Sequence, residues 1–303
     1  MPTSSASMNR FSKVKRPSGS WGPERRLEFV DFRLQWDGRL NRADLIEHFG
    51  ISVPQASADI AKYTELAPKN LEYDRSERVY VAAASFRPFF ASSSTERFLS
   101  DLLARESGHP PANLSYVGWA PPIAIAGTPA RAVPPDVLVT FVQAIRSRQT
   151  VRALYQSMSR PEPAWREVSP HGIGHDGFRW HVRAYCETRR AFRDFVFARV
   201  LEVEPGRESS MDPANDVAWS STVPLVLIPS PGLSASRRKV VELDYAMVDG
   251  RLTLECRQAM LYYSLQRLGL SRDGELKPEA QQIALENAKE VSQVLKGLAK
   301  SYD

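Results

Sequence analysis

One ordered series of helix and strand signals constrains the fold of this chain most. The apolar spacing predicts a helix over 23–36, a second over 42–49, a third from 53 to just before Pro68, and two short strands around the polar turn "RSE". Helix, helix, turn, helix, hairpin is the order of a winged helix-turn-helix, so the sequence predicts this DNA-binding fold over residues 22–90. Any small three-helix domain followed by a hairpin would give the same order, and this alternative stays open.

Capping residues mark the ends of the predicted helices. Asn41 stands where it can cap the second helix, and Asp44 at the third position favours a helix N-terminus. Gly50 ends that helix, and Ser52 can cap the next one, with Pro54 in its first turn. The turn between the two helices is therefore short, as a helix-turn-helix requires.

The third helix is the expected recognition helix and would lie in the major groove of duplex DNA. Gln55 could bond an adenine edge and Ser57 a base or a phosphate, with Ser52 at the start of the same surface. Four basic residues are expected to meet phosphates: Arg42, Lys62, Lys69 and Arg75. Residues 22–90 carry ten basic and eleven acidic residues, so one copy should bind weakly. A dimer on a palindromic site is expected, because two linked heads gain effective concentration.

A strongly basic region lies in the middle of the chain. Residues 146–199 contain eleven Arg, no Lys and five acidic residues, which gives this window a net charge of +6. Arg offers a planar, always-charged fork that suits phosphate, and aromatic rings beside it offer stacking surfaces for bases. The strand-like stretch "FRWHVRAYC" at 178–186 puts Phe, Trp, Val, Ala and Cys on one face, the expected core, and Arg, His, Arg and Tyr on the other. That second face is predicted to be either an ordinary solvated surface or a binding site.

The pattern of breaks divides the chain into five parts. The expected segments are a disordered basic tail (1–21), a winged helix (22–90), a helix with a Pro-rich linker (91–133), a helix with a small bent sheet or barrel (134–205) and a C-terminal module (222–303). In the last module the pattern predicts a hairpin over 237–257 and helices over 258–268 and 278–300. The helical apolar residues Leu261, Tyr262, Leu265 and Leu268 indicate a core, with a subunit interface as the alternative.

Several motifs of the middle region occur together and in order. They are Tyr155-x-Ser157, "SPHG", "RWHVRAYC" and "FRDFVFARV". With the winged helix before them, they resemble the WYL-domain transcriptional regulators, and within these the repressors of CBASS and BREX phage-defence operons. The Trp-Tyr-Leu that gives the family its name reads here Trp180-His181-Val182, so the middle residue departs from the family pattern.

The resemblance implies an α+β, multidomain, ligand-responsive repressor. The WYL domain of such proteins is an Sm/SH3-like small barrel that senses a nucleic acid or a nucleotide, and the C-terminal extension serves dimerisation. Residues that could converge on such a ligand are Tyr155, Ser157, His171, His181, Arg183, Tyr185, Arg193 and Arg199. The alternative is that these arginines form a solvated face paired with Glu167, Glu187 and Asp194.

Other functions find less support in the sequence. No Gly-rich phosphate loop, paired-histidine helix, Cys cluster or nucleophile elbow occurs, so no enzyme, metal site or cofactor is expected. The two cysteines, 186 and 256, are expected to be reduced core residues of a cytosolic protein, and no transmembrane or signal segment is expected. Two rivals stay open: a single-strand- or RNA-binding protein that uses the basic sheet, and a phosphodiester hydrolase built on Asp194 and His171.

Overall fold

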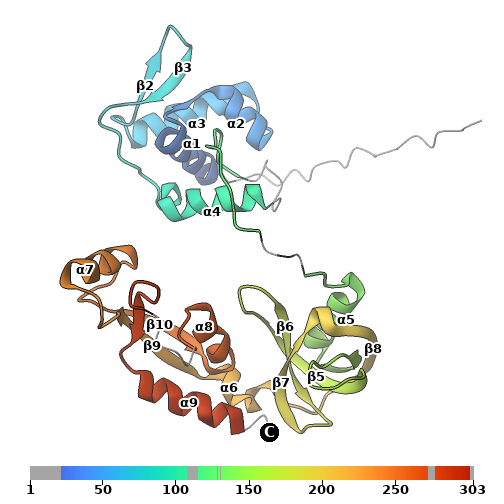
Figure 1. Ribbon diagram of the computed structural model, residues 1–303. Helices are drawn as coiled ribbons and strands as arrows, with labels where there is room; N and C mark the ends of the chain where they lie inside the picture. Colours follow the sequence, from blue (N-terminus) through green and yellow to red (C-terminus); the bar gives the residue numbers. More distant parts are fainter. Residues whose placement is uncertain (1–21, 108–114, 128, 130, 272–276, 301–303) are drawn as a thin grey trace, which may run out of the picture. The chain divides into compact units, whose positions relative to one another are not determined.

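The computed structural model describes residues 22–107, 115–127, 129, 131–271 and 277–300. The chain divides into two compact units, Met1–Gly127 and Thr128–Asp303. Among the described residues, helices and three antiparallel sheets follow one another along the chain, which confirms the α+β class (Figure 1). The expected basic tail and part of the expected Pro-rich linker lie outside the described residues.

The first unit has the element order of a winged helix, with the β2–β3 hairpin extending from the helices (Figure 1). Its elements are α1 (Pro23–Asp37), β1 (Arg39–Leu40), α2 (Arg42–Phe49), α3 (Val53–Leu66), β2 (Leu71–Asp74), β3 (Val79–Ala82) and α4 (Thr95–Glu106). Gly38 ends α1 with φ of 70°, a conformation that favours glycine. Asn41 and Asp44 form a capping box at the start of α2, and the Ser52 hydroxyl accepts a hydrogen bond from the Gln55 amide at the start of α3.

A buried carboxylate organises this unit. Asp31 on α1 is fully buried and accepts hydrogen bonds from the Tyr63 hydroxyl (2.5 Å) and the Ser93 hydroxyl (2.6 Å). The backbone amides of Phe89 (3.0 Å) and Phe90 (3.1 Å) donate to the same carboxylate. Burial, together with the hydrogen bond to Asp31, raises the pKa of the Tyr63 hydroxyl. One side chain thus fixes α1 to α3 and to the segment that follows the wing.

The segment after the wing also contributes to the core of the first unit. Phe98 of α4 stacks on Trp36 of α1 with ring centroids 4.2 Å apart. Tyr116 and Val117, within the expected Pro-rich linker, are buried in the same apolar cluster as Phe29 and Phe32. This part of the linker is therefore packed structure.

The second unit begins with α5 (Pro135–Ser147), which starts at the predicted proline and covers a bent five-stranded sheet. The strands are β4 (Gln149–Tyr155), β5 (Ala164–His175), β6 (Trp180–Cys186), β7 (Ala191–Val196) and β8 (Val200–Glu208), in the order β7-β6-β5-β4-β8. Phe141 of α5 packs edge-on against Phe197 in the core between helix and sheet. In the described part of the chain the end strands β7 and β8 are not paired with each other, so the sheet is open and does not close into the barrel that the resemblance implied.

The motif "FRDFVFARV" is divided between two strands by a short 3-10 helix. β7 ends at Val196, a 3-10 helix spans Phe197–Arg199, and β8 starts at Val200. The two strands lie on opposite edges of the sheet, with Arg193 on β7 and Arg199 in the 3-10 helix between them.

The C-terminal part forms a second, three-stranded sheet with helices. Its elements are α6 (Val217–Ser220), β9 (Thr222–Pro229), α7 (Ala235–Asp244), β10 (Leu252–Arg257), α8 (Leu261–Arg267), β11 (Ile283–Leu285) and α9 (Ala288–Lys300). The predicted hairpin over 237–257 is wrong, because α7 replaces its first strand and β10 pairs with β9. Two adjacent valines indicated a strand, but Val241 packs instead as a helical residue against Leu227 and Ile283.

The last predicted helix begins later than expected. Residues 283–285 form β11 against β9, and α9 starts at Ala288. Asn287 explains the boundary: its side chain accepts a hydrogen bond from the Val226 amide (3.1 Å) and donates one to the Pro224 carbonyl (2.9 Å). The residue before α9 is thereby held to β9. Among the described helices none is long and apolar enough to cross a membrane.

Candidate functional site

The exposed face of α3 carries part of the predicted DNA surface. Gln55 is exposed, and its amide nitrogen donates to Asp59 Oδ1 at 3.0 Å. Asp59 is held in turn by Arg26, whose Nε lies 2.6 Å from Asp59 Oδ2, and both of these side chains are nearly buried. The Arg26–Asp59 pair thus fixes α3 to α1 and sets the direction of the Gln55 side chain along the helix.

The other predicted DNA contacts lie at several places on the first unit. Lys62 stands seven residues from Gln55, so the two share one line along the helix, and its ammonium group is 3.0 Å from Glu65. Ser57 is half-buried on the opposite edge of the helix, two residues beyond Gln55. The remaining predicted contacts, on α2, after α3 and in the wing turn, are all exposed: Arg42, Lys69 and Arg75.

The polar face of β6, which the alternation of the sequence left open as a solvated surface, is buried. His181 is 3% exposed and Arg183 is 2% exposed, while Trp180, expected in the core, is 52% exposed. His181 Nε2 lies 3.0 Å from Asp176 Oδ2. Burial raises the pKa of Asp176, but the hydrogen bonds from His181, Arg179 and the local backbone outweigh it and hold this pKa well below its ordinary range. The residues that follow the sheet along the chain cover this face, which the sequence pattern could not show.

A buried ionic cluster joins this face of the sheet to the C-terminal part. The Arg183 guanidinium makes two bonds to Asp216, Nε to Oδ2 at 2.7 Å and Nη2 to Oδ1 at 3.0 Å. His171 Nε2 lies 3.0 Å from the same Asp216 Oδ2. Arg183 Nη1 donates to Asp194 Oδ1 at 3.2 Å, and the Tyr263 hydroxyl donates to Asp194 Oδ2 at 3.2 Å. The cluster therefore connects β5, β6 and β7 with α6 and α8.

Asp216 is the centre of this cluster. Its residue is 2% exposed, and it stands at the N-cap of α6, where its carboxylate also accepts the Trp219 amide at 3.2 Å. Burial raises the pKa of Asp216, but the hydrogen bonds from His171 and Arg183 outweigh it and lower this pKa to about 2. Gly172 explains why α6 can approach so closely: a Cβ at this position would lie 2.6 Å from the Trp219 ring.

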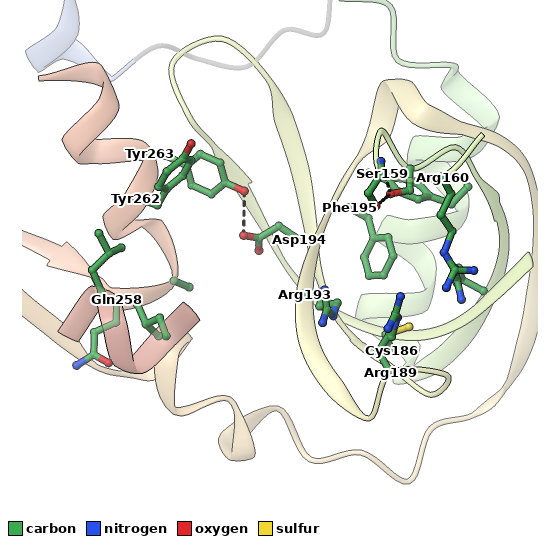
Figure 2. Close-up of a pocket in the computed structure, with 16 residues that line it drawn as sticks. Ser159, Arg160, Cys186, Arg189, Arg193, Asp194, Phe195, Gln258, Tyr262 and Tyr263 are labelled. Atoms are coloured by element: carbon green, nitrogen blue, oxygen red, sulfur yellow. Dashed lines mark hydrogen bonds between the residues drawn. The ribbon is translucent and has the colours of Figure 1, made fainter. Parts of the chain in front are cut away.

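A pocket of about 620 Å³ opens between the sheet and the C-terminal helices (Figure 2). Four arginines line it: Arg160, Arg166, Arg189 and Arg193. Four aromatic residues line it as well, two from the sheet and two from α8: Tyr155, Phe195, Tyr262 and Tyr263. Guanidinium groups beside aromatic rings form a surface suited to phosphate and to stacked bases. In Figure 2, Tyr263 points across the space towards Asp194 of β7.

The structure brings some of the predicted ligand residues into this pocket and places others elsewhere. Tyr155, Ser157 and Arg193 line it. His171, His181 and Arg183 are instead bound to buried carboxylates, as described above. Tyr185 packs against the Phe192 ring with centroids 5.2 Å apart, and Arg199 lies in the 3-10 helix after β7.

Sequence reasoning missed three of the four pocket arginines. Arg160 lies in the connection between β4 and β5, Arg166 lies in β5, and Arg189 lies in the turn after β6. The absence of Lys from residues 146–199 was the signal that could have indicated these arginines, because it extends over the loops as well as the strands. The proposed glutamate partners are exposed or half-exposed; Asp194 alone of the three suggested acids pairs with Arg183.

The arrangement suits anion binding. His171 and Asp194, considered for a hydrolase, are tied to Asp216 and to Arg183, and nothing in their geometry favours turnover. Across the part of the chain that the structure describes, no group of three or more His, Cys, Asp or Glu residues could hold a metal ion. Both cysteines are free and buried.

Comparison with known families matches all three folded regions. Residues 22–104 match the BrxR transcriptional regulator winged helix-turn-helix domain, residues 136–205 the WYL domain, and residues 222–291 the BrxR transcriptional regulator C-terminal dimerization domain.

Similar proteins cover nearly the whole chain. The DNA-binding transcriptional repressor CapW of Escherichia coli (strain KTE188) is 44% identical over 287 residues, which is 94% of this chain and 96% of that protein. CapW of Pseudomonas aeruginosa is 44% identical over 92% of this chain and 94% of its own length. Proteasome accessory factor B/C of Arthrobacter aurescens matches at 18% identity with a TM-score of 0.24, over 100% of this chain and 52% of that one, too low to bear on the fold. The chain therefore belongs to the family of WYL-domain regulators that includes CapW and BrxR.

Proposed function

We propose that this protein is a homodimeric transcriptional repressor that leaves its operator when a nucleic acid or nucleotide binds the WYL-domain pocket. The observation that carries the proposal is the pocket itself. Four arginines and four aromatic side chains surround it, and α8, within the region that matches a dimerisation domain, forms one of its walls. A ligand bound there touches both the sheet and the part of the chain that pairs the subunits.

The DNA-binding half of the proposal rests on the winged helix. Its charge is close to neutral over residues 22–90, so one copy would hold DNA weakly at physiological salt. Two copies in a dimer on a palindromic operator would bind far more tightly, with half-sites a whole number of helical turns apart. Gln55 would read a base, Arg42, Lys62, Lys69 and Arg75 would contact phosphates, and Ser52 would lie at the start of the same surface. Ser57, on the opposite edge of α3, lies away from this surface.

The family supports a proposal for the controlled genes. The chain's relatives carry the name of the CapW repressor, and two of its three domains match BrxR. The resemblance to repressors of phage-defence operons supports an operon of that kind as the target. Release by a nucleic acid or nucleotide would then couple the expression of defence genes to a signal produced during infection.

A paired substitution tests the pocket. Arg189→Ala with Arg193→Ala should leave the dimer folded and bound to its operator, because neither residue lies in the winged helix. Binding of labelled single-stranded oligonucleotides and of nucleotides should fall on the order of a hundredfold, since each lost charge-assisted contact accounts for about tenfold. Fluorescence anisotropy measures both affinities on the same preparation.

The matched control is Arg152→Ala. This arginine lies on β4 of the same sheet, is exposed, pairs with Glu204, and does not line the pocket. It removes a positive charge from the WYL domain without touching the site. Equal ligand affinity in the wild type and in the Arg189/Arg193 variant would show that the ligand binds elsewhere.

A further inference from the structure

One acidic side chain stands among the pocket arginines. Of the described residues that line the pocket, Asp194 alone is acidic, and its side chain is 12% exposed. The Asp194 carboxylate would repel an anion bound by these arginines. Anion binding therefore does not explain why an aspartate lies here, and another explanation is required.

The hydrogen bonds of Asp194 give this explanation. One carboxylate oxygen accepts from Arg183 of β6 and the other from the Tyr263 hydroxyl of α8, each at 3.2 Å. Arg183 is itself held by two bonds to Asp216 and is 2% exposed, so it stays in place whether or not Asp194 moves. The contact with Tyr263 is the one that joins β7 to α8, and a displaced Asp194 breaks that junction.

We propose that Asp194 sets the ligand affinity of the pocket by occupying the place of an anion and by holding the WYL sheet to α8 through Tyr263. This inference rests on the proposed function. A phosphate near Arg189 and Arg193 repels the Asp194 carboxylate, and the repulsion falls when Asp194 turns away from the pocket and leaves Tyr263. Anion binding and the Asp194–Tyr263 bond thus exclude one another.

This competition supplies the coupling that a ligand-responsive repressor requires. A ligand shifts an equilibrium only by its differential affinity for two states. Here the two states differ in a contact between β7 and α8, and α8 lies in the region that matches the dimerisation domain. Occupation of the pocket loosens that junction, and the bonded state is the one that binds the operator.

The first test uses no ligand and compares two neighbouring residues of α8. Tyr263→Phe removes the hydroxyl that donates to Asp194, whereas Ser264→Ala removes a hydroxyl outside the pocket that accepts a bond from the Cys256 thiol. Tyr263→Phe should weaken operator binding about tenfold, because one hydrogen bond made in only one state accounts for about that ratio. Ser264→Ala should leave operator affinity unchanged. Circular dichroism and light scattering confirm that both variants fold and dimerise.

The second test removes the charge and keeps the shape. Asp194→Asn should raise the affinity for a short single-stranded oligonucleotide on the order of tenfold, because the repulsion disappears. Glu202→Gln is the control for net charge, since Glu202 is an exposed acid of β8 outside the pocket. It should change the affinity by less than about twofold.

The outcomes separate this inference from the proposed function. If Tyr263→Phe and Ser264→Ala bind the operator equally, or if Asp194→Asn binds the oligonucleotide no better than Glu202→Gln, the inference is overturned. If wild type and Asp194→Asn bind neither oligonucleotide nor nucleotide, the proposed ligand class fails, and with it the competition at the pocket. In that case a weakened operator affinity of Tyr263→Phe still supports the structural contact as the determinant of the operator-binding state.

Discussion

The substitution Asp216→Asn tests the buried cluster that joins the WYL sheet to the C-terminal part. Asp216 accepts two bonds from Arg183 and one from His171, and the Arg183 and Asp216 side chains are each 2% exposed. Loss of one partner from a buried ion pair costs about 3–5 kcal/mol, because the other charge stays buried without compensation. Asn keeps an accepting oxygen and Arg183 keeps Asp194, so the expected loss is at the lower end, about 3 kcal/mol.

Urea unfolding of the purified protein measures this loss, with tryptophan fluorescence as one signal because Trp219 packs on the cluster. Asp212→Asn is the matched control, four residues earlier, where an exposed aspartate accepts only the Ala214 amide. It should cost less than about 1 kcal/mol. A loss below about 0.5 kcal/mol for Asp216→Asn, equal to that of the control, would refute the view that the cluster stabilises this junction.

Three further predictions follow from the structure. The pKa of Asp216 is lowered from 3.8 to about 2, so its ionised form contributes roughly 2 kcal/mol to the free energy of unfolding. This contribution is complete above pH 4 and disappears as the pH falls towards 2. In acid unfolding experiments, the stabilities of the wild type and Asp216→Asn should therefore converge near pH 2. Gln55→Ala should lose about 1–3 kcal/mol of discrimination at one base pair, whereas Lys62→Ala should weaken all duplexes alike and flatten the salt dependence in binding titrations. Leu243 lies on α7 in the region that matches a dimerisation domain, and its side chain is 72% exposed. Leu243→Glu should raise the dimer dissociation constant, measured by sedimentation, at least about tenfold, whereas Leu201→Glu on β8 should not raise it.

The winged helix could be predicted closely because its boundaries are set by local chemistry. Asn41 and Ser52 satisfy backbone amides within three residues, and Gly38 and Gly50 take left-handed conformations that end their helices. Such signals depend on neighbours in the sequence and not on tertiary contacts. The same reasoning found α5 from its proline.

Elements decided by tertiary packing could not be predicted. Val240 and Val241 indicated a strand, but Val241 completes a core with residues from β9 and β11, so α7 forms. The 3-10 helix after Val196 divides a continuous apolar run, and no residue in that run indicates the break.

In the candidate site, too, local features could be predicted and tertiary contacts could not. The alternation of β6 correctly grouped His181 with Arg183 on one face, but it could not tell what covers that face. The carboxylate that binds Arg183 comes from Asp216, thirty-three residues further along the chain. Which residues pair at that distance depends on the path of the chain between the two sheets. The alternation of polar and apolar residues along one strand carries no information about that path.

One titration asks whether a ligand in the WYL-domain pocket releases the operator. Labelled operator duplex bound to the wild-type dimer is titrated with a short single-stranded oligonucleotide, and the same titration is run with the Arg189→Ala, Arg193→Ala variant. We expect the oligonucleotide to release the wild type, and the variant to bind the operator equally well but to be released only at concentrations on the order of a hundredfold higher. Release of both proteins at the same oligonucleotide concentration would show that the pocket plays no part in release from the operator.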